Sequence, residues 1–362
     1  MRDVVRILLL ADTHLGFDLP VQPRVRRRRR GHDFLANYAA ALQPALERRV
    51  DLVVHGGDVF NRSRPPSTVA FQAFEPLTRA ADAGVPVYIV PGNHERGRLP
   101  HLRFAKHSGI HIFDVPRTFV AEVRGVRVAL AGFPSERDDV RAKFPELLEQ
   151  TGWRDTAAQA TVLCTHQCVE GAKVGPADFT FTTAADVIRG RDLPAGLSAV
   201  LSGHIHRHQV LTTGLRGRPL AAPVLYPGSI ERTSIAEADE TKGYMVVELT
   251  LGDSDTQVGW EFVPLPARPL VFRELQLESL AEADAERQVA ALIQSVPADA
   301  VLTIRIVGTP TDTSLRLPSA ARLRALAPDT MNIELRLPER GVTPRRPRPH
   351  RDEDVLELPF GP

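Results

Sequence analysis

The alternation of apolar and polar positions predicts strands and helices in turn over the N-terminal quarter of the chain. Three compact apolar runs, at residues 4–12, 51–57 and 85–93, have the length and the residue types of buried strands. Between them, residues 32–50 and 67–84 repeat apolar positions at helical spacing. This strand–helix–strand order predicts parallel strands that are joined by helical crossovers.

Strands dominate the chain after this point. Residues 119–132 alternate apolar and polar positions and turn at Arg124 and Gly125, which is a hairpin signal. A helix is expected at 136–150. Further strands are expected at 160–165, 197–202, 208–213, 243–250 and 257–263. The pattern predicts an α/β fold, a four-layer sandwich of two mixed β-sheets flanked by helices.

A proline-rich seam at 264–270 divides the chain into a large first domain and a small second one. The second part combines helices and strands in a compact α+β unit. Its expected elements are helices at 285–296 and 319–327 and strands at 300–308 and 330–338. We expect domains at 1–265 and 266–338, followed by a charged, proline-rich tail at 339–362 that buries too little apolar surface to fold alone.

Composition narrows the class of protein. Of the 362 residues, 43% are apolar and 25% are charged, as in globular proteins. Because the sequence lacks an apolar run near the ~18 residues of a membrane span, we expect a cytoplasmic protein with no membrane contact. The net charge of +1 means that any affinity for nucleic acid must come from local patches. The two cysteines, Cys164 and Cys168, exclude a disulfide framework.

Side chains that bind metal ions follow five of the predicted strands. Ligand sites in open α/β sheets form at the carboxyl ends of strands, so residues at these positions are expected to meet. The glycines Gly56 and Gly57 let the backbone turn sharply after an apolar strand. The candidate metal ligands are Asp12, His14, Asp58, Asn93, His166, His204 and His206.

The spacing and chemistry of these residues favour a site for two metal ions. In an extended chain, residues i and i+2 face the same side, so Asp12 and His14 are expected to converge, and so are His204 and His206. Asp58 lies between the two clusters and suits a bridge between ions about 3.5–4 Å apart. The ligands are imidazoles, carboxylates and an amide, without thiolate, which favours Mn²⁺, iron or Zn²⁺, with Mn²⁺ expected first.

The ordered motifs D-x-H, G-G-D, G-N-H-E, T-H and G-H-I-H resemble the calcineurin-like metallophosphoesterases. Three longer stretches, GGDVFNRSRPPSTVAF, YPGSIERTSIAE and KGYMVVEL, resemble the SbcD-like DNA-repair nucleases of the meiotic recombination eleven family. The resemblance covers roughly residues 4–338. It implies a metallophosphoesterase nuclease domain at 1–265 and a DNA-capping domain at 266–338.

The resemblance also implies roles for single residues and for partners. One metal ion would be held by Asp12, His14, Asp58 and His206, and the other by Asp58, Asn93, His166 and His204. His94 would protonate or steady the leaving oxygen. The implied protein is a two-metal DNA nuclease that acts in DNA end and hairpin processing and in double-strand break repair. It would form a homodimer and work with an SMC-like ABC ATPase of the SbcC type, with residues 352–362 as a reduced docking motif.

Two features bear on contacts with DNA. Where the family has a histidine that positions DNA, this chain has Asn61, which carries no charge, so the cutting efficiency is expected to differ. Residues 95–107 form one basic candidate for DNA contact. An arginine run after the first metal motif is expected to contact DNA phosphates, and it comprises Arg26, Arg27, Arg28, Arg29 and Arg30.

Alternatives stay open at this point. The same metal site suits a phosphoesterase for small molecules such as cyclic nucleotides, or for phosphoproteins, although the arginine run and the second domain are then unexplained. A non-enzymatic scaffold is a third alternative. Among the other candidate ligands, His55 is expected in the core and His208 on the solvent side. Cys164 and Cys168 are expected as small buried apolar residues.

Overall fold

The computed structural model describes residues 3–19, 27–252, 256–276, 282–307 and 319–336. The chain forms two compact units. The first comprises Met1–Val271, Asp299–Val301 and Asp329–Asn332, and the second comprises Phe272–Ala298, Leu302–Pro328 and Ile333–Pro362. Among the described residues, no helix is both long and apolar enough to span a membrane. The predicted tail, with its expected docking motif, and Arg26 lie outside the described residues.

The first sheet carries the parallel strands that the sequence predicts. Its strands are β1 Val4–Leu10, β2 Leu52–His55, β3 Val87–Ile89, β4 Ile110–Ile112, β15 Gly243–Leu251 and β16 Thr256–Pro264. They lie in the order β16-β15-β1-β2-β3-β4. β1 to β4 are parallel, while β15 runs antiparallel to β1 and β16 antiparallel to β15. The sheet is therefore mixed.

The second sheet is also mixed. Its strands are β5 Arg117–Val123, β6 Val126–Gly132, β7 Ala160–Thr165, β12 Ala199–Ser202, β13 Gln209–Thr213 and β14 Pro219–Tyr226. They lie in the order β13-β14-β12-β7-β6-β5, with parallel pairing in the middle and antiparallel pairing at both edges. Two short ribbons accompany it, formed by β8 Cys168–Val169 with β11 Val187–Ile188 and by β9 Lys173–Val174 with β10 Phe179–Thr180.

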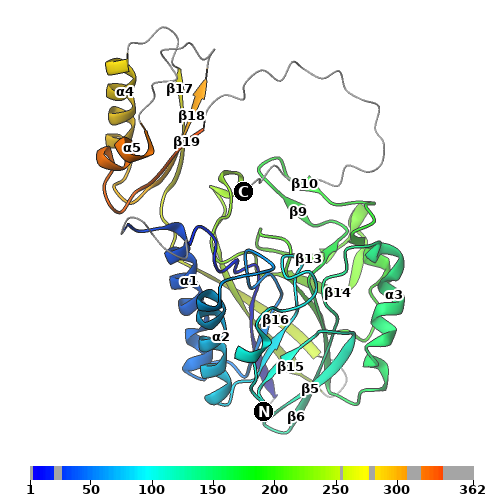
Figure 1. Cartoon of the computed structure of the whole chain (residues 1–362). Helices are drawn as coiled ribbons and strands as arrows, with labels where there is room; N and C mark the ends of the chain where they lie inside the picture. The colour runs from blue at the N-terminus through cyan, green and yellow to red at the C-terminus, as the bar shows by residue number, and fades with distance from the viewer. Residues whose placement is uncertain (1–2, 20–26, 253–255, 277–281, 308–318, 337–362) are drawn as a thin grey trace. The chain divides into compact units, whose positions relative to one another are not determined.

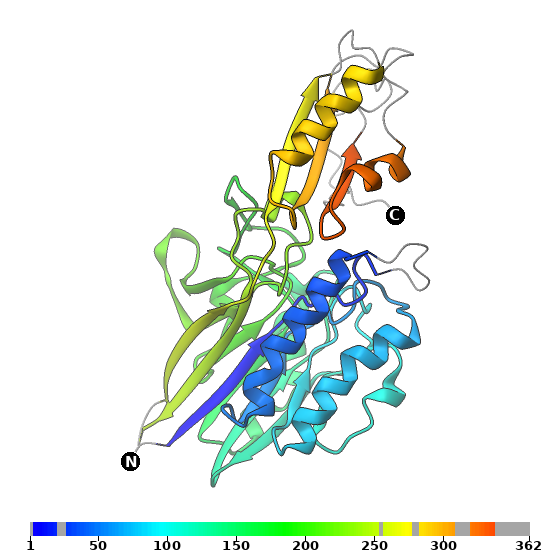
Figure 2. The ribbon, with the colours of Figure 1, turned by 90° about the vertical axis from the view of Figure 1, so that its left-hand side faces the viewer.

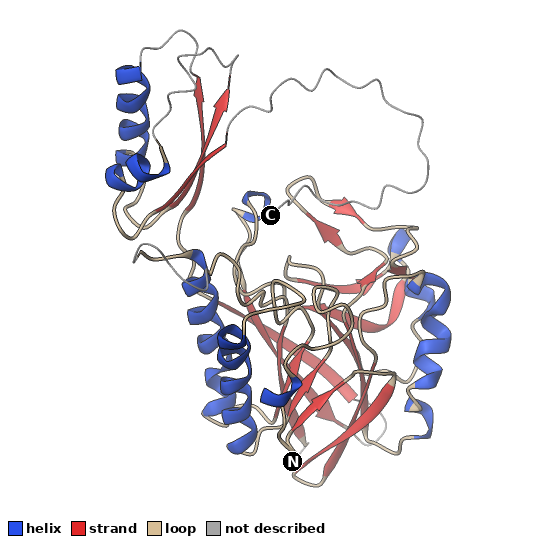
Figure 3. Cartoon of the chain, in the orientation of Figure 1, coloured by secondary structure: helices blue, strands red, loops and turns tan. Residues whose placement is uncertain are grey.

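Helices cover the outer faces of the two sheets (Figures 1 and 3). α1 and α2 lie on one side and α3 on the other, so the unit has four layers. The helices are α1 Arg30–Leu46, α2 Ser67–Asp82 and α3 Val140–Gln150, and the short 3-10 turns are η1 Leu102–Phe104, η2 Trp153–Asp155, η3 Gly190–Asp192, η4 Leu215–Gly217 and η5 Ile235–Glu237. The predicted four-layer α/β sandwich is confirmed.

The apolar run of β1 reflects burial on both faces of its sheet. Leu8 and Leu10 pack into the cluster formed with α1 and α2, whereas Ile7 and Leu9 pack into the cluster between the two sheets. A strand buried on both faces reads as a continuous apolar run rather than as an alternating one. The strand is therefore held rigidly up to Leu10, two residues before the first candidate ligand.

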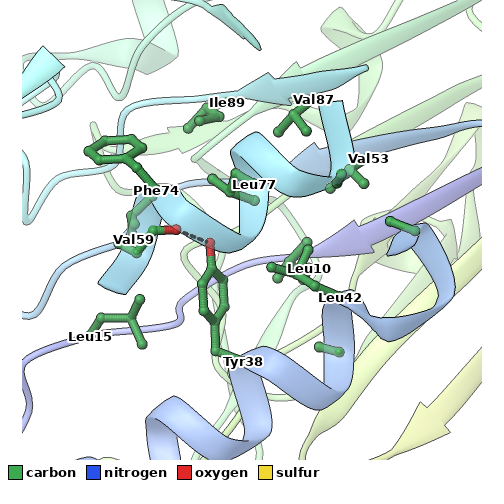
Figure 4. Close-up of a cluster of buried hydrophobic side chains, with 14 of the residues drawn as sticks. Leu10, Leu15, Tyr38, Leu42, Val53, Val59, Phe74, Leu77, Val87 and Ile89 are labelled. Carbon is green, nitrogen blue, oxygen red and sulfur yellow. Dashed lines mark hydrogen bonds between the residues drawn. The ribbon is translucent and has the colours of Figure 1, made fainter. Parts of the chain in front are cut away.

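α1 and α2 lie side by side over the first sheet (Figure 2) and share one apolar cluster. Leu42 of α1, Leu77 of α2 and Leu10 of β1 belong to this cluster (Figure 4). The hydroxyl of Tyr38 crosses between the helices and donates a hydrogen bond to the carbonyl oxygen of Ala73, at 2.9 Å. This bond satisfies a phenol that is 1% exposed.

Several expected boundaries differ from the observed ones. α1 begins at Arg30 rather than at residue 32, so the helix includes the end of the arginine run. β14 was not predicted, because Pro219 and Pro223 weaken the strand pattern. The strand forms because Pro219 is its first residue, and because β12 pairs only with Val224 and Leu225, beyond Pro223.

The second unit is a three-stranded sheet with two helices. Its elements are β17 Leu270–Gln276, α4 Glu282–Gln294, β18 Val301–Val307, α5 Ala320–Leu326 and β19 Asn332–Arg336. The strands lie in the order β17-β18-β19, and both helices cover the same face (Figure 1). Val289, Ile293, Ile304 and Leu323 are buried between these layers. The unit has the α+β composition that the sequence predicts.

Replacing Tyr38 by phenylalanine is expected to lower the free energy of unfolding by about 1 kcal/mol, because it removes one buried hydrogen bond without creating a cavity. Urea unfolding followed by circular dichroism measures the change. Tyr244→Phe is the matched control, since its hydroxyl has no hydrogen bond within the described part of the chain. Equal losses in the two variants would contradict the role given to the Tyr38 hydroxyl.

Candidate metal centre

The loops that leave five strands gather at one end of the two sheets of the first unit (Figure 3). Asp12 and His14 follow β1, Asp58 follows β2, Asn93 follows β3, His166 follows β7, and His204 and His206 follow β12. The first three strands belong to one sheet and the other two to the second sheet. The structure therefore brings the seven predicted ligand residues to one place, at the carboxyl ends of strands from both sheets.

Glycines let the two sheets approach each other at this site. A Cβ atom on Gly56 would lie 2.9 Å from the backbone nitrogen of Gly203, and a Cβ atom on Gly203 would overlap the carbonyl oxygen of Gly56. Gly57 has φ +105, and a Cβ atom there would overlap the ring of His166. The apolar strand β2 thus ends in two glycines because a side chain would separate the sheets.

One half of the site joins the ends of β1 and β12. The Nε2 atoms of His14 and His206 lie 3.0 Å apart, and the backbone amide of His204 donates to both carboxylate oxygens of Asp12, each at 3.1 Å. One oxygen of Asp58 lies 4.0 Å from Nε2 of His14. The ligand atoms of Asp12, His14 and His206 all lie within 4.8 Å of one another.

The other half of the site surrounds Asn93. Its side-chain oxygen lies 2.8 Å from Nε2 of His166 and 3.0 Å from Nδ1 of His204. Nε2 of His166 is also 3.4 Å from the oxygen of Asp58 that faces His14. Nδ1 of His166 donates to the carbonyl oxygen of Gly56 at 2.7 Å, which leaves Nε2 as the ring nitrogen that faces the cluster.

The electrostatics of this cluster suit divalent cations. Asp12 and Asp58 are 0% and 2% exposed, and burial raises the pKa of Asp12. Burial also acts to raise the pKa of Asp58, but His166 outweighs it and holds this pKa well below its usual range. Burial would lower the pKa of His166, but Asp58 raises it to about 9. Two buried carboxylates among converging imidazole nitrogens are a donor set that divalent metal ions fit.

The backbone at the ligands is not extended, which corrects one sequence argument. Asp12, His14, Asp58 and His204 have φ values of 50, 41, 52 and 83, in the left-handed region. Aspartate and histidine tolerate this region better than most residues, and such strain gathers at functional sites. The expected convergence of His204 and His206 on one point is wrong, because His204 turns to Asn93 and His206 turns to His14.

His94 differs from the other histidines of the site in its exposure. Its side chain is 38% exposed, against 27% for His206, 2% for His14 and 0% for His166. Its Nδ1 donates to the carbonyl oxygen of Asn61 at 2.9 Å, and its Nε2 lies 3.8 Å from Asp58. Asn61 thus fixes the ring of His94 through its backbone, a role that its residue type did not reveal.

Glu95 joins two of the ligand loops and was not predicted as a site residue. Its buried carboxylate accepts hydrogen bonds from the backbone amides of Asp58 at 3.1 Å, Phe60 at 2.8 Å and Gly92 at 2.8 Å. Burial and the nearby Asp58 raise its pKa to about 8, although these amides favour the ionised form. Glu95 stands in the G-N-H-E motif, so its position was visible in the sequence but its partners were not.

Glu237 holds the ring of His206 from the opposite side. Its carboxylate lies 3.3 Å from Nδ1 of His206 and accepts a hydrogen bond from the hydroxyl of Thr233 at 2.6 Å. Nζ of Lys242, a side chain that is 1% exposed, lies 2.7 Å from Glu237 and 2.8 Å from Glu240. A carboxylate at Nδ1 leaves Nε2 to face the candidate ligands, as is usual for histidines that bind metal ions.

Three of the predicted DNA-contacting arginines, Arg28, Arg29 and Arg30, bond to or lie close to other groups of the protein. Arg28 pairs with Asp33 at 2.6 Å, Arg29 pairs with Asp18, and Arg30 bonds to the carbonyl oxygen of Arg232 and lies 3.8 Å from Glu231. The side chain of Arg27 is 8% exposed. The charge of the run is therefore mostly neutralised, and its contact with DNA stays a prediction.

The remaining candidate ligands lie apart from the two halves of the site. His55 is buried, as expected, and its Nε2 lies 3.0 Å from the hydroxyl of Thr13. Cys164 and Cys168 are buried and free, as expected. His208 is partly exposed; its ring stacks on Phe262 with centroids 4.0 Å apart, and its Nδ1 lies 3.1 Å from the carbonyl oxygen of Tyr226.

Comparison with known sequences identifies the first unit. Residues 5–208 match the sequence model of the calcineurin-like phosphoesterases. This range contains the seven predicted ligands together with His94 and Glu95.

Curated relatives extend the similarity beyond this range. A DNA double-strand break repair protein Mre11 of Methanosarcina mazei is 28% identical over 68% of this chain and 36% of its own length. Proteins of the same name from Archaeoglobus fulgidus and Thermoplasma acidophilum are 27% and 23% identical, over 75% and 68% of this chain and 61% and 63% of their lengths. The chain thus spans about a third to two thirds of the length of these relatives.

Glu237→Gln is expected to weaken Mn²⁺ binding roughly 10-fold or more, because a neutral amide holds the His206 tautomer less firmly than a carboxylate does. Isothermal titration calorimetry measures the affinity. Glu240→Gln is the matched control, since Glu240 also contacts Lys242 but not His206. A similar loss of affinity in both variants, or none in Glu237→Gln, would contradict this role.

Proposed function

Because the chain belongs to the calcineurin-like phosphoesterase family, we propose that it is a metal-dependent nuclease that hydrolyses phosphodiester bonds in DNA. The observation that carries the proposal is the meeting of imidazole, carboxylate and amide ligands from five strands at one site. The names of the curated relatives support DNA as the substrate. We infer a role in DNA end and hairpin processing during double-strand break repair.

Two divalent cations suit this site, with Mn²⁺ as the first candidate. Asp58 would serve both ions, since one of its oxygens lies 4.0 Å from Nε2 of His14 and 3.4 Å from Nε2 of His166. When bound, two such ions lower the pKa of a water molecule and screen the charge of the phosphate. One ion would be held by Asp12, His14, Asp58 and His206, and the other by Asp58, Asn93, His166 and His204.

His94 is the residue proposed to move a proton. Its Nδ1–H is held by the carbonyl oxygen of Asn61, so the proton that it transfers must sit on Nε2, on the side of Asp58. A water oxygen bonds to phosphorus and releases one proton to solvent, the bond between phosphorus and the leaving oxygen breaks, and the imidazolium form of His94 gives its Nε2 proton to that oxygen. Its exposure, greater than that of His14 or His166, is what contact with substrate requires.

The partners proposed for this chain follow from the family resemblance. We propose that residues 266–338 cap bound DNA, that the chain forms a homodimer, and that an SMC-like ABC ATPase of the SbcC type works with it in the cytoplasm. One structural feature supports a protein partner for the first unit. Phe71 of α2 and Leu102 of η1 are 56% and 51% exposed, and the ring of Phe104 lies 6.1 Å from that of Phe71.

A substrate panel with Mn²⁺ tests the substrate class. Labelled duplex DNA, a cyclic nucleotide and bis-p-nitrophenyl phosphate are each incubated with the protein, and product formation is followed over time. DNA is expected to be cut, and EDTA is expected to abolish the reaction, because the ligands lose their ions. Hydrolysis of the cyclic nucleotide with intact DNA would replace the nuclease by a small-molecule phosphoesterase.

His94→Gln is expected to lower the rate of DNA hydrolysis about 10²–10⁴-fold while metal affinity stays close to that of the wild type, since His94 is proposed as an acid and not as a ligand. Single-turnover kinetics and calorimetry measure the two quantities. His101→Gln is the control, because His101 also bonds to a loop carbonyl, that of Pro65, whereas the ligand atoms of His94, His14 and Asp58 lie within 4.8 Å of one another. Unchanged turnover in His94→Gln would exclude the proposed role.

A further inference from the structure

We propose that four exposed arginines on two adjacent loops, Arg62, Arg64, Arg96 and Arg98, bind the phosphate backbone of a nucleic-acid strand next to the metal centre. This inference rests on the proposed nuclease function and names the surface that would hold its substrate. Arg62 directly follows Asn61 and Arg96 directly follows Glu95, and the other two arginines come two residues later in each loop. The arginine run at 26–30 is a different segment of the chain.

These four arginines carry charge that the protein does not neutralise. None of them forms an ion pair or a side-chain hydrogen bond within the described part of the chain, and all four are exposed. Residues 59–74 contain no acid, and residues 93–113 contain only Glu95, which is buried against backbone amides. An unpaired, one-sign patch of this kind attracts a polyanion.

The two loops are fixed to each other and to the site. Nδ1 of His94 bonds to the carbonyl oxygen of Asn61 at 2.9 Å, and Nε2 of His101 bonds to that of Pro65 at 2.8 Å. These two bonds bracket Arg62 and Arg64 on one loop and the other two arginines on the second. The backbone that carries the four arginines is therefore held in place next to His94, the proposed proton donor.

The turn after His94 is also held by its own backbone. The amide of Arg96 donates to the carbonyl oxygen of Asn93 at 3.0 Å, and that of Arg98 donates to the carbonyl oxygen of Glu95 at 3.1 Å. Arg96 has φ 54 and Gly97 has φ 70, both in the left-handed region. A tight turn in this conformation places two arginines three and five residues after the candidate ligand Asn93, which suits contact with phosphates that flank the cleaved bond.

Phosphate is the chemical group that this arrangement favours. Guanidinium groups bind phosphate oxygens bidentately, and such contacts position a strand without reading its bases. The contrast with Arg28 and Arg29 is direct, since those side chains already have the carboxylates of Asp33 and Asp18. The loop arginines can bind an anion without first breaking an ion pair within the described part of the chain.

The test compares two double variants, R62Q/R64Q and R96Q/R98Q, with the wild type. Binding of fluorescein-labelled duplex DNA is measured by fluorescence anisotropy in EDTA, so that DNA stays intact, between about 50 and 200 mM salt. Each double variant is expected to bind roughly tenfold more weakly, with a slope of log K against log salt smaller by about 2, because two phosphate contacts are lost.

The matched control is R48Q/R127Q, which removes two exposed arginines that have no side-chain partner within the described chain and that lie before β2 and at the start of β6, away from the carboxyl ends of those strands. Its DNA affinity and salt slope are expected to match the wild type. Thermal unfolding of each variant checks that the fold is intact. Equal losses in control and loop variants, or no loss in the loop variants, would overturn the inference.

The outcome separates this inference from the proposed function. If the wild type hydrolyses bis-p-nitrophenyl phosphate with Mn²⁺ but never cuts DNA, the nuclease proposal fails. If the wild type cuts DNA but the loop variants bind and cut it as well as the control does, the nuclease stands and the arginine surface is wrong. Weaker DNA binding in the loop variants but not in the control supports the proposed arginine surface.

Discussion

The close approach of the ends of β2 and β12, at Gly56 and Gly203, is the constraint on which the rest of the first unit depends. Neither glycine can carry a Cβ atom, because each would meet the backbone of the other. The contact brings the end of β2 against the end of β12, so ligands from both sheets reach one point. A larger residue at either position would separate Asp58 from His166 and divide the candidate centre in two.

Two buried acids then hold the ligand loops in different ways. The carboxylate of Glu95 accepts hydrogen bonds from three backbone amides and so fixes the course of the loops after β2 and β3. Glu237 acts on a side chain, the ring of His206, and its charge is balanced by the buried Lys242. Removing one partner of such a buried pair leaves an uncompensated charge. The resulting loss of stability is larger than the net stability that the pair contributes. The network therefore specifies the orientation of one ligand more than it adds to stability.

The sequence predicted the fold class and the meeting of the ligands because both follow from local pattern and strand topology. Apolar runs locate β1, β2 and β7, and parallel strands bring Asp12, Asp58 and His166 to a common edge of the sheets. The directions of single side chains could not be predicted in the same way. Left-handed φ values at Asp12, His14 and His204 break the two-residue periodicity from which convergence was argued, so Asp12 and His14 meet as expected but His204 and His206 turn to different partners.

Interactions between residues that are distant in the sequence could not be predicted either. Glu237 lies 31 residues after His206, and the carbonyl oxygen of Arg232 that Arg30 contacts lies 202 residues after Arg30. The prolines of β14 weaken a local signal that neighbouring strands override. Local pattern therefore located the strands and the candidate ligands, whereas tertiary pairing decided which charges and rings are engaged.

Pairing also decides how much each arginine can contribute to binding a polyanion. Arg30 lies near Glu231, stacks over Phe17 with its guanidinium carbon 5.1 Å from the ring centroid, and has a side chain that is only 12% exposed. To reach a phosphate it would have to give up its hydrogen bond to the carbonyl oxygen of Arg232 and its contacts with Glu231 and Phe17. An exposed arginine without a partner, such as Arg62 or Arg98, bears no such cost and gains the full contact. In a chain with a net charge of +1, the location of unpaired arginines is therefore a better guide to a nucleic-acid surface than the density of arginines along the sequence.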